Sequence, residues 1–125
     1  MNKIELGKQG EAVATQLLKA NGYRILARNV KAKFGEIDIV AKDGQTLCFI
    51  EIKARTSERF GWPEEGVNLK KQWRLSRLAS WYLKFHRLND PQVRFDVVSI
   101  LLRPQGIPAR TRLIKGAFET SQPLL

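Results

Sequence analysis

The sequence predicts one α/β domain built on a mixed β-sheet, and three observations support that fold class. The chain has 125 residues, and single domains run on the order of 100–200 residues, so we expect one domain over residues 1–125. Two segments carry apolar residues at helical spacing. The other apolar segments have the alternation or the β-rich composition of strands. In chain order the segments read α-β-β-β-α-β-β, which is typical of a compact α/β domain.

The first helix is expected at residues 3–20, where one stripe holds Leu6, Gly10, Val13, Ala14, Leu17 and Leu18. Asn21-Gly22 should end this helix, because glycine readily adopts the left-handed cap conformation. At about 100° per residue, Glu11 lies just beyond the edge of the apolar stripe. It is therefore either a solvated glutamate or a carboxylate that reaches past the packed face.

The rest of the chain predicts five strands and a second helix. The strands are expected at residues 23–30, 36–41, 46–54, 92–102 and 110–118, with a basic turn at residues 31–35 and a loop at residues 55–67. The second helix is expected at residues 69–88, where Asn68 can cap its first turn. Its apolar face is expected to hold Leu69, Trp73, Leu78 and Tyr82.

Asp43-Gly44 stands between two β-rich segments, which is a strong signal for a two-residue hairpin turn. With that turn, Asp38 faces Phe49 and Glu36 faces Glu51. Strand alternation places three carboxylates and one lysine on one face of the hairpin, namely Glu36, Asp38, Glu51 and Lys53. The opposite face carries no charge and is expected to be core: Ile37, Ile39, Ala41, Cys48, Ile50, Ile52 and Ala54.

The carboxylates on one sheet face indicate either a metal site or a set of ion pairs. Like charges at facing positions destabilise a sheet, whereas a hard cation such as Mg²⁺ favours carboxylate oxygens. Acids within apolar strands are also costly to bury unless they are paired or bound to a metal. Lys53 projects to the same side, where a lysine can orient a water or neutralise charge that develops on a phosphate. The alternative is a polar face on which Lys53 pairs with Glu51 or Glu36.

The formal net charge of +10 predicts a polyanionic partner. Nucleic acid is the first choice and an anionic membrane the second, but a membrane surface has no use for the acidic cluster. We therefore expect nucleic acid and no membrane, and no apolar segment approaches the roughly 18 residues of a membrane span. The one cysteine, Cys48, can form no internal disulfide and fits a reducing compartment, so we expect a cytoplasmic location.

Basic residues near the hairpin and on the second helix are the candidate contacts to a nucleic-acid backbone. Lys70, Arg74 and Arg77 are spaced to share one helix face, which is either a solvated face or a row of phosphate contacts. Four more basic residues lie near the hairpin ends and could flank a bound strand: Lys31, Lys33, Arg55 and Arg59. Trp62 could stack on an unpaired base or pack over the edge of the domain.

Several short motifs resemble those of the YraN family of small bacterial proteins. They are Gly10-Glu11, Gly22-Tyr23, Arg28-Asn29, GEIDIVA at residues 35–41, FIEIKAR at residues 49–55 and RFDVV at residues 94–98. That family in turn resembles the PD-(D/E)XK nuclease superfamily, close to the archaeal Holliday-junction resolvases. The resemblance implies a restriction-endonuclease-like core of order α-β-β-β-α-β, followed here by an extra C-terminal strand.

The resemblance also implies roles for single residues. Asp38, Glu51 and the carbonyl of Ile52 would bind Mg²⁺ or Mn²⁺. Glu11 would complete the metal shell directly or through a water. Lys53 would position the attacking water against the scissile phosphate.

The implied activity is metal-dependent hydrolysis of phosphodiester bonds in structured or branched DNA. A four-way junction presents paired cleavage sites, so a resolvase-like role implies a homodimer. Glu36 lies outside the minimal set of the superfamily and is a further or alternative ligand. The alternative function is a non-catalytic DNA- or RNA-binding module with the same fold.

Overall fold

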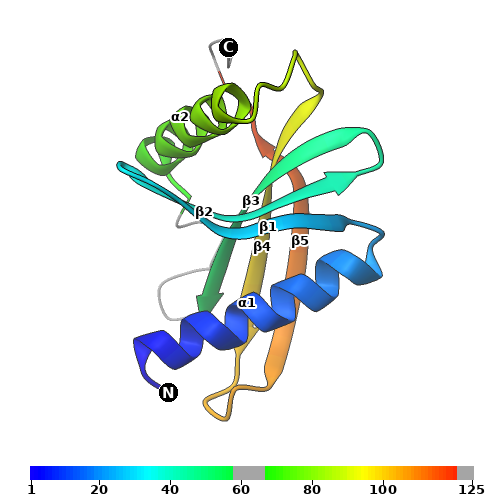
Figure 1. Cartoon of the computed structure of the whole chain (residues 1–125). Coiled ribbons are helices and arrows are strands. Elements are labelled where there is room, and N and C mark those ends of the chain that lie inside the picture. The colour runs from blue at the N-terminus through cyan, green and yellow to red at the C-terminus, as the bar shows by residue number, and fades with distance from the viewer. Residues whose placement is uncertain (58–66, 121–125) are drawn as a thin grey trace.

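The computed structural model describes residues 1–57 and 67–120, and within these ranges it has the predicted order of two helices and five strands. The elements are α1 (Lys3–Ala20), β1 (Arg24–Ala32), β2 (Gly35–Asp43), β3 (Thr46–Arg55), α2 (Leu69–Phe85), β4 (Val93–Leu102) and β5 (Pro108–Phe118). The strands form a mixed sheet in the order β1-β2-β3-β4-β5, in which β3 and β4 are parallel and the other neighbours are antiparallel. Figure 1 shows α1 and α2 on opposite faces of this sheet.

The helices begin at the residues that the sequence predicts. The side chain of Asn2 accepts a hydrogen bond from the backbone N–H of Glu5 at 2.8 Å, and Asn68 accepts one from Lys71 at 3.0 Å. These caps satisfy N–H groups that the first turn of a helix leaves without a partner. Gly22 follows α1 with a φ of 85°, so it takes the expected left-handed conformation. No helix in the described ranges is both long and apolar enough to cross a membrane.

Gly10 brings α1 unusually close to the sheet. A Cβ atom at this position would lie 2.8 Å from the Cβ of Ala54 in β3 and 3.8 Å from a methyl group of Ile52. Carbon atoms do not approach to 2.8 Å without a shift of the backbone, so the glycine is required by the packing. The close approach also fixes the position of Glu11, the next residue of the helix.

Two apolar cores lie on the two faces of the sheet. The core under α1 contains Ala14, Leu18, Tyr23, Ile39, Ala41, Cys48, Ile50, Val98, Ile100 and Leu102. The core under α2 contains Ile37, Val40, Leu47, Phe49, Leu75, Leu78, Ala79, Tyr82, Leu83 and Phe95. Ile37 is buried as expected, but it lies in the core under α2, whereas alternation placed it on the same face as Ile39. The pairing of β2 with β3 stops at Ile39, and Ile37 and Val40 both turn toward α2, so strict alternation is lost at this point.

The buried stripe of α2 also differs from the predicted one. Leu69 and Trp73 are 80% and 62% exposed, although both were expected on the apolar face. The stripe that packs against the sheet is Leu75, Leu78, Ala79, Tyr82 and Leu83. Both stripes have helical spacing, so the apolar pattern alone does not choose between them. The helix ends at Phe85 rather than at residue 88.

The turn between β2 and β3 lies one residue later than predicted. Asp43 pairs with Thr46, so the turn is Gly44-Gln45, and Gly44 takes a φ of 61°. Asp43 is still part of β2 because its carboxylate is held by two basic side chains. Arg94 Nη2 donates to it at 2.7 Å and Lys115 Nζ at 3.1 Å. The basic turn of residues 31–35 is likewise shorter, since β1 runs to Ala32 and β2 begins at Gly35.

Arg94 is also the centre of a buried polar network that ties the sheet together. Its guanidinium donates to Asp96 at 2.8 and 2.9 Å and to the hydroxyl of Tyr23 at 3.0 Å. Asp96 is 1% exposed and also accepts hydrogen bonds from Tyr23 and from the backbone N–H of Gly116. Burial opposes ionisation of Asp96, but these hydrogen bonds hold its pKa below the ordinary value. The charge is therefore paired, and the network connects β2, β4 and β5 with Tyr23, the residue before β1.

Candidate functional site

Asp38 lies where two strands of the sheet stop pairing. The ladder between β2 and β3 runs from the turn to the pair Ile39–Ile50 and no further. Beyond that pair, the carboxylate of Asp38 accepts a hydrogen bond from the backbone N–H of Ile52 at 2.8 Å. The half-buried side chain thus takes the place of a backbone acceptor at the point where β2 leaves β3.

Glu51 is the neighbour of Asp38 across the two strands. When the register of the β2–β3 ladder is extended by one pair beyond Ile39–Ile50, Asp38 lies across from Glu51. The predicted register placed Asp38 across from Phe49. The predicted facing of Glu36 with Glu51 is wrong for the same reason. Burial, the charge of Glu51 and a hydrogen bond with Glu51 together raise the pKa of Asp38 to about 7, although the Ile52 N–H opposes this. The two carboxylates form a close acidic pair.

Two lysines lie beside this pair. Lys53 Nζ is 3.4 Å from a carboxylate oxygen of Glu51, and both side chains are 17% exposed. Lys71, in the first turn of α2, lies beside Lys53. A hydrogen bond with Lys53, burial and the charge of Lys53 lower the pKa of Lys71. The structure therefore brings together two carboxylates and two lysines, each of which is a partly buried residue.

Lys71 is the site residue that the sequence prediction missed. It lies four residues before Leu75 and seven before Leu78, so it heads the stripe of α2 that packs against the sheet. That spacing was available in the sequence. The predicted stripe of Leu69 and Trp73 instead places Lys71 on a solvated side.

Glu11 lies close to the acidic pair but is not joined to it. Its carboxylate accepts a hydrogen bond from the side chain of Asn29 at 3.0 Å. The neighbours of Asn29 pair with Ile39 and Ile37, so Asn29 lies next to Asp38 on the adjacent strand. Within residues 1–57 and 67–120, no three His, Cys, Asp or Glu side chains are grouped closely enough to hold a metal ion. Asp38 and Glu51 are the predicted acids that the fold brings into contact.

Glu36 and Ile52 have smaller parts in the observed geometry. Glu36 is exposed, and its charge contributes less than burial and Glu51 to the raised pKa of Asp38. Ile52 contributes its N–H to Asp38, and its carbonyl as a metal ligand stays a prediction. Of the predicted metal ligands, the carboxylates of Asp38 and Glu51 are thus the two that lie in contact.

The three predicted basic residues of α2, Lys70, Arg74 and Arg77, are all exposed. The tip of the β1–β2 hairpin packs against the same helix. A Cβ at Gly35 would lie 3.3 Å from the Arg74 side chain, and the ring of Phe34 lies 4.7 Å from the Arg77 guanidinium. Lys33 precedes Phe34 in this tip, at the end of the hairpin that packs against α2.

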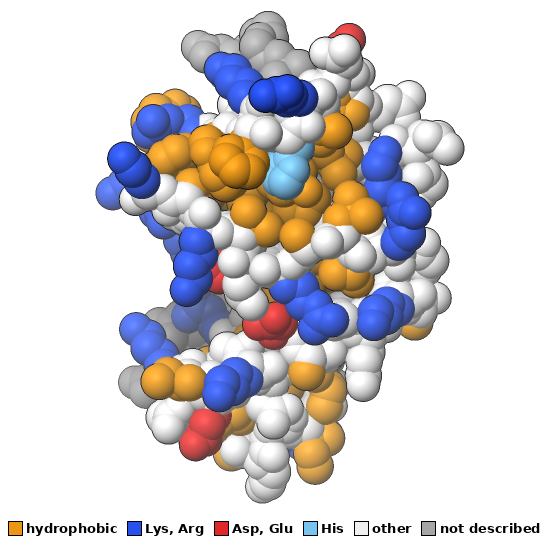
Figure 2. Space-filling view, in the orientation of Figure 1, with side chains coloured by type: hydrophobic (Ala, Val, Ile, Leu, Met, Phe, Trp, Pro, Cys, Tyr) orange, Lys and Arg blue, Asp and Glu red, His pale blue; other side chains and the backbone are white. Residues whose placement is uncertain are grey.

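The other predicted contacts lie at strand ends. Lys31 is exposed near the end of β1, and Arg55 is half-buried as the last residue of β3. Arg59 and Trp62 lie outside the described residues. Figure 2 shows the molecule hollowed on the side between α2 and α1, with Lys and Arg side chains along the rims and an acidic side chain inside. In the same orientation, β3 ends beside this hollow (Figure 1).

Comparison with known proteins gives the family of this chain. The model of "Uncharacterised protein family UPF0102" matches residues 10–100. A UPF0102 protein of Syntrophus aciditrophicus is 46% identical over 116 residues, which cover 93% of this chain and 90% of the relative. One of Moorella thermoacetica is 47% identical over 118 residues, covering 94% and 98%, and one of Symbiobacterium thermophilum is 49% identical over 113 residues, covering 90% and 95%. The chain belongs to the UPF0102 family, which is the YraN family that its motifs resemble.

Proposed function

We propose that this protein is a metal-dependent endonuclease that hydrolyses phosphodiester bonds in structured or branched DNA. The observation that carries the proposal is the acidic pair of Asp38 and Glu51 with Lys53 and Lys71 beside it. Acids are costly to place in a sheet next to one another, and a chain of net charge +10 attracts polyanions. Phosphodiester hydrolysis uses both properties, because it needs metal ligands and a positively charged surface.

The fold supports this proposal. An antiparallel β1-β2-β3 unit is followed by α2 and by β4, which is parallel to β3. With α1 before it, this order of elements agrees with the α-β-β-β-α-β core that the resemblance implies, and β5 follows as a further strand. We therefore include in the proposal membership of the PD-(D/E)XK superfamily, close to the archaeal Holliday-junction resolvases. A homodimer on a four-way junction and a cytoplasmic location belong to the same proposal.

The residues present fit Mg²⁺ or Mn²⁺. The charge of Glu51 helps to raise the pKa of Asp38 to about 7, and a divalent cation between the two would remove that repulsion. Mg²⁺ is commonly held by only one or two carboxylates, with substrate phosphates and water as further ligands. The Ile52 carbonyl and, through water, Glu11 would add to this set. When bound, the ion would supply a Lewis acid and lower the pKa of a water.

The basic residues would act on the substrate. The Lys53 ammonium, which pairs with Glu51 at 3.4 Å, would orient the attacking water at the scissile phosphate. Lys71 would neutralise the charge that develops on the phosphate in the transition state. The remaining basic residues would hold the DNA backbone on either side, namely Lys31, Lys33, Arg55, Arg59, Lys70, Arg74 and Arg77.

A non-catalytic DNA- or RNA-binding module is the second candidate, and one observation favours it. Lys53 pairs with Glu51, and the Ile52 N–H pairs with Asp38, so these side chains have protein partners without a metal. In that case the cluster would stabilise the sheet, and the basic surface alone would carry the function.

Cleavage assays separate the two candidates. A four-way junction, a flap and a plain duplex are incubated with Mg²⁺ or Mn²⁺ and with wild type, Asp38→Asn or Lys53→Ala. Matched controls are Asp90→Asn, at the exposed turn after α2, and Lys19→Ala, exposed in the last turn of α1. We expect wild type and both controls to cleave the branched substrates, and each site variant to lose on the order of 100-fold or more in rate.

Other outcomes have definite meanings. Equal cleavage by wild type and both site variants would remove the assigned site. Binding of all three DNA molecules without cleavage by any protein would leave the second candidate. Binding itself should weaken steeply as salt is raised, because phosphate contacts release counterions.

A further inference from the structure

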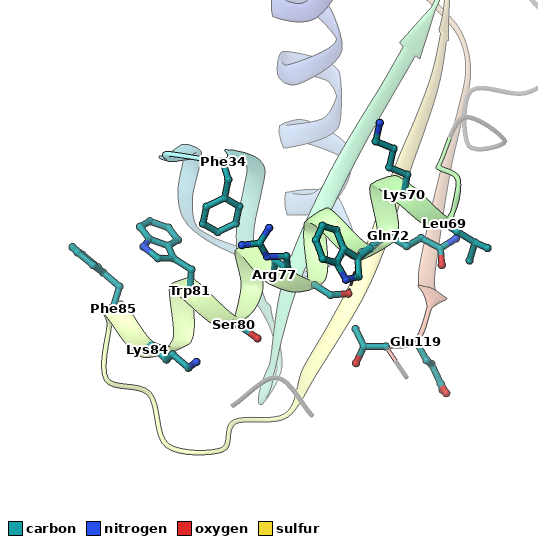
Figure 3. Close-up of a pocket in the computed structure, with 13 residues that line it drawn as sticks. Phe34, Leu69, Lys70, Gln72, Arg77, Ser80, Trp81, Lys84, Phe85 and Glu119 are labelled. Carbon is teal, nitrogen blue, oxygen red and sulfur yellow. Dashed lines mark hydrogen bonds between the residues drawn. The ribbon is translucent and has the colours of Figure 1, made fainter. Parts of the chain in front are cut away.

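The solvent-facing side of α2 carries a row of aromatic and basic side chains that the proposed active site does not use. Lys71 faces the acidic pair, whereas Trp73, Arg77, Trp81 and Phe85 line a groove of about 1270 Å³ on the other side of the helix. Figure 3 shows Phe34, Trp81 and Phe85 toward one end of the groove, Leu69 and Lys70 at the other, and Arg77 between them.

The aromatic residues of this groove are unusually exposed. Trp73 is 62% exposed and Phe85 69%, and Phe34, on the β1–β2 tip, is 37% exposed. Trp81 is half-buried and its ring lies 5.4 Å from that of Phe85. Large apolar side chains gathered on a surface mark an interaction site more often than single ones do.

The groove is basic as well as aromatic. The guanidinium of Arg77 lies 4.7 Å from the Phe34 ring and 4.9 Å from the Trp73 ring, so one cation stands between two aromatic faces. Lys70 and Lys84 line the groove at its two ends, and Glu119 is its one acidic lining residue in the described part of the chain. If a second copy of this chain packed here with the same groove, these cations would face one another and repel. A polyanion would pair with them.

We infer that this groove binds unpaired nucleotides of a single-stranded segment, with bases stacked on the aromatic rings and phosphates on the basic side chains. Surfaces that bind single strands combine a basic groove with aromatic platforms in this way. Of the aromatic residues on the helix, Trp73 lies eight residues before Trp81, which is about 12 Å along a helix, and the Trp81 and Phe85 rings contact each other. Stacked bases of a duplex are roughly 3.4 Å apart, so the row suits bases that have left the stack. The inference rests on the nucleic-acid part of the proposed function, and it names unpaired segments as the part of the substrate held beside the active site.

The test compares two oligonucleotides of equal length and charge, a thymidine 20-mer and a fully abasic 20-mer with the same backbone. Fluorescence anisotropy gives the affinity of wild type, Trp73→Ala and Phe85→Ala for each. Ile107→Ala, an exposed apolar residue in the β4–β5 turn, is the matched control. Thermal unfolding of each variant checks that it is folded.

We expect wild type and the control to prefer the thymidine strand by about tenfold or more, because base stacking contributes on the order of 1–3 kcal/mol per base. Trp73→Ala and Phe85→Ala should lose that preference and keep their affinity for the abasic strand. Equal affinity of wild type for both strands would overturn the inference without using any variant. An unchanged preference in both folded variants would also overturn it.

Two further measurements separate this inference from its rivals. Sedimentation could show that wild type is a dimer and that Trp73→Ala is a monomer with an unchanged base preference. That result would assign the groove to contact with a second copy and refute the nucleotide site. Cleavage of a branched substrate is measured in parallel. If the groove variants lose the base preference but wild type cleaves no substrate, the nucleotide groove is supported and the nuclease proposal is refuted. If wild type cleaves normally but shows no base preference, the nuclease proposal is supported and the nucleotide groove is refuted.

Discussion

The carboxylate of Asp38 accepts a hydrogen bond from the backbone N–H of Ile52 at 2.8 Å, at the point where β2 and β3 separate. In a regular antiparallel ladder that N–H would bond to a backbone carbonyl of the neighbouring strand. The side chain replaces the carbonyl, so the strands part without leaving the N–H of Ile52 unsatisfied. The same bond fixes the carboxylate beside Glu51. Asp38 therefore stabilises the sheet and forms half of the acidic pair.

The raised pKa of Asp38 predicts a characteristic dependence of stability on pH. Its pKa is about 7 in the folded protein and near 4 in an unfolded chain, so between these values the folded state holds a proton that the unfolded state has lost. The contribution of Asp38 to the free energy of unfolding is complete below about pH 4 and is lost as the pH rises through 7. From pH 5 to pH 8, the free energy of unfolding of Asp38→Asn should therefore rise relative to that of wild type by on the order of 1–3 kcal/mol, as measured by denaturant unfolding. Asp90→Asn should show the same pH dependence of the free energy of unfolding as wild type. The same pH dependence in Asp38→Asn would contradict a raised pKa of Asp38.

Metal binding should be visible without any substrate. An ion that binds only the folded state at a hundred times its Kd stabilises by about 2.7 kcal/mol, so Mn²⁺ should raise the Tm of wild type by several degrees. Asp38→Asn and Glu51→Gln should each lose this shift, whereas Lys53→Ala should keep it. The shift should grow from pH 6 to pH 8, because Asp38 must release its proton to bind the ion. A shift that is unchanged in both acid variants would place the ion elsewhere.

Lys71 provides a test that the sequence prediction would not have suggested. If the proposed nuclease activity is present, Lys71→Met should lower kcat by on the order of 100-fold with little change in KM, because the amine acts on the transition state. Lys70→Met, one residue away and exposed, should change KM more than kcat. The pH dependence of cleavage should change in Lys71→Met alone, since the amine of Lys71 has a lowered pKa. Identical kinetics for the two variants would place Lys71 among the general backbone contacts.

The close contact of α1 with β3 predicts a destabilising Gly10→Ala substitution. Alanine favours a helix by up to about 1 kcal/mol over glycine, but here its methyl would lie 2.8 Å from that of Ala54. Overpacking of this kind costs roughly 1–3 kcal/mol, so the net change in the free energy of unfolding should be a loss. Adding Ala54→Gly to Gly10→Ala should recover part of the loss, because it removes the opposing methyl. Gly7→Ala is the control, since nothing lies within 4 Å of its added Cβ and the variant should be neutral or more stable.

The Arg94 network predicts a large loss for a single change. Arg94→Met would leave Asp96, which is 1% exposed, without its main cationic partner. Breaking one side of a buried ion pair costs about 3–5 kcal/mol, which thermal or denaturant unfolding will measure. Changing both residues, as Arg94→Met with Asp96→Asn, should cost less than Arg94→Met alone. A loss below about 1 kcal/mol for the single variant would show that Asp96 carries no charge in the fold.

Much of the site followed from local patterns. The period of two along β3 placed Glu51 and Lys53 on one face, the face from which Phe49 packs toward α2. Alternation along β2 is lost around Asp38, and Asp38 joins them through its contact with Glu51. The position of the turn, which sets the register of β2 with β3, decided which carboxylates face one another. The sequence pattern favoured Asp43-Gly44, but Arg94 and Lys115 hold Asp43 in the strand. Those partners are 51 and 72 residues away along the chain, so no local signal reports them.

The sequence by itself determined the order of the elements, the ends of α1, the start of α2 and the sharing of one face of β3 by Glu51 and Lys53. It did so because caps and strand alternation depend on residues only a few positions apart. Tertiary structure decided which stripe of α2 is buried, and with it that Lys71 joins the site while Trp73 faces solvent. Two stripes of one helix can bury similar apolar area. The choice between them is made by the shape of the sheet and of the β1–β2 tip against which the helix packs.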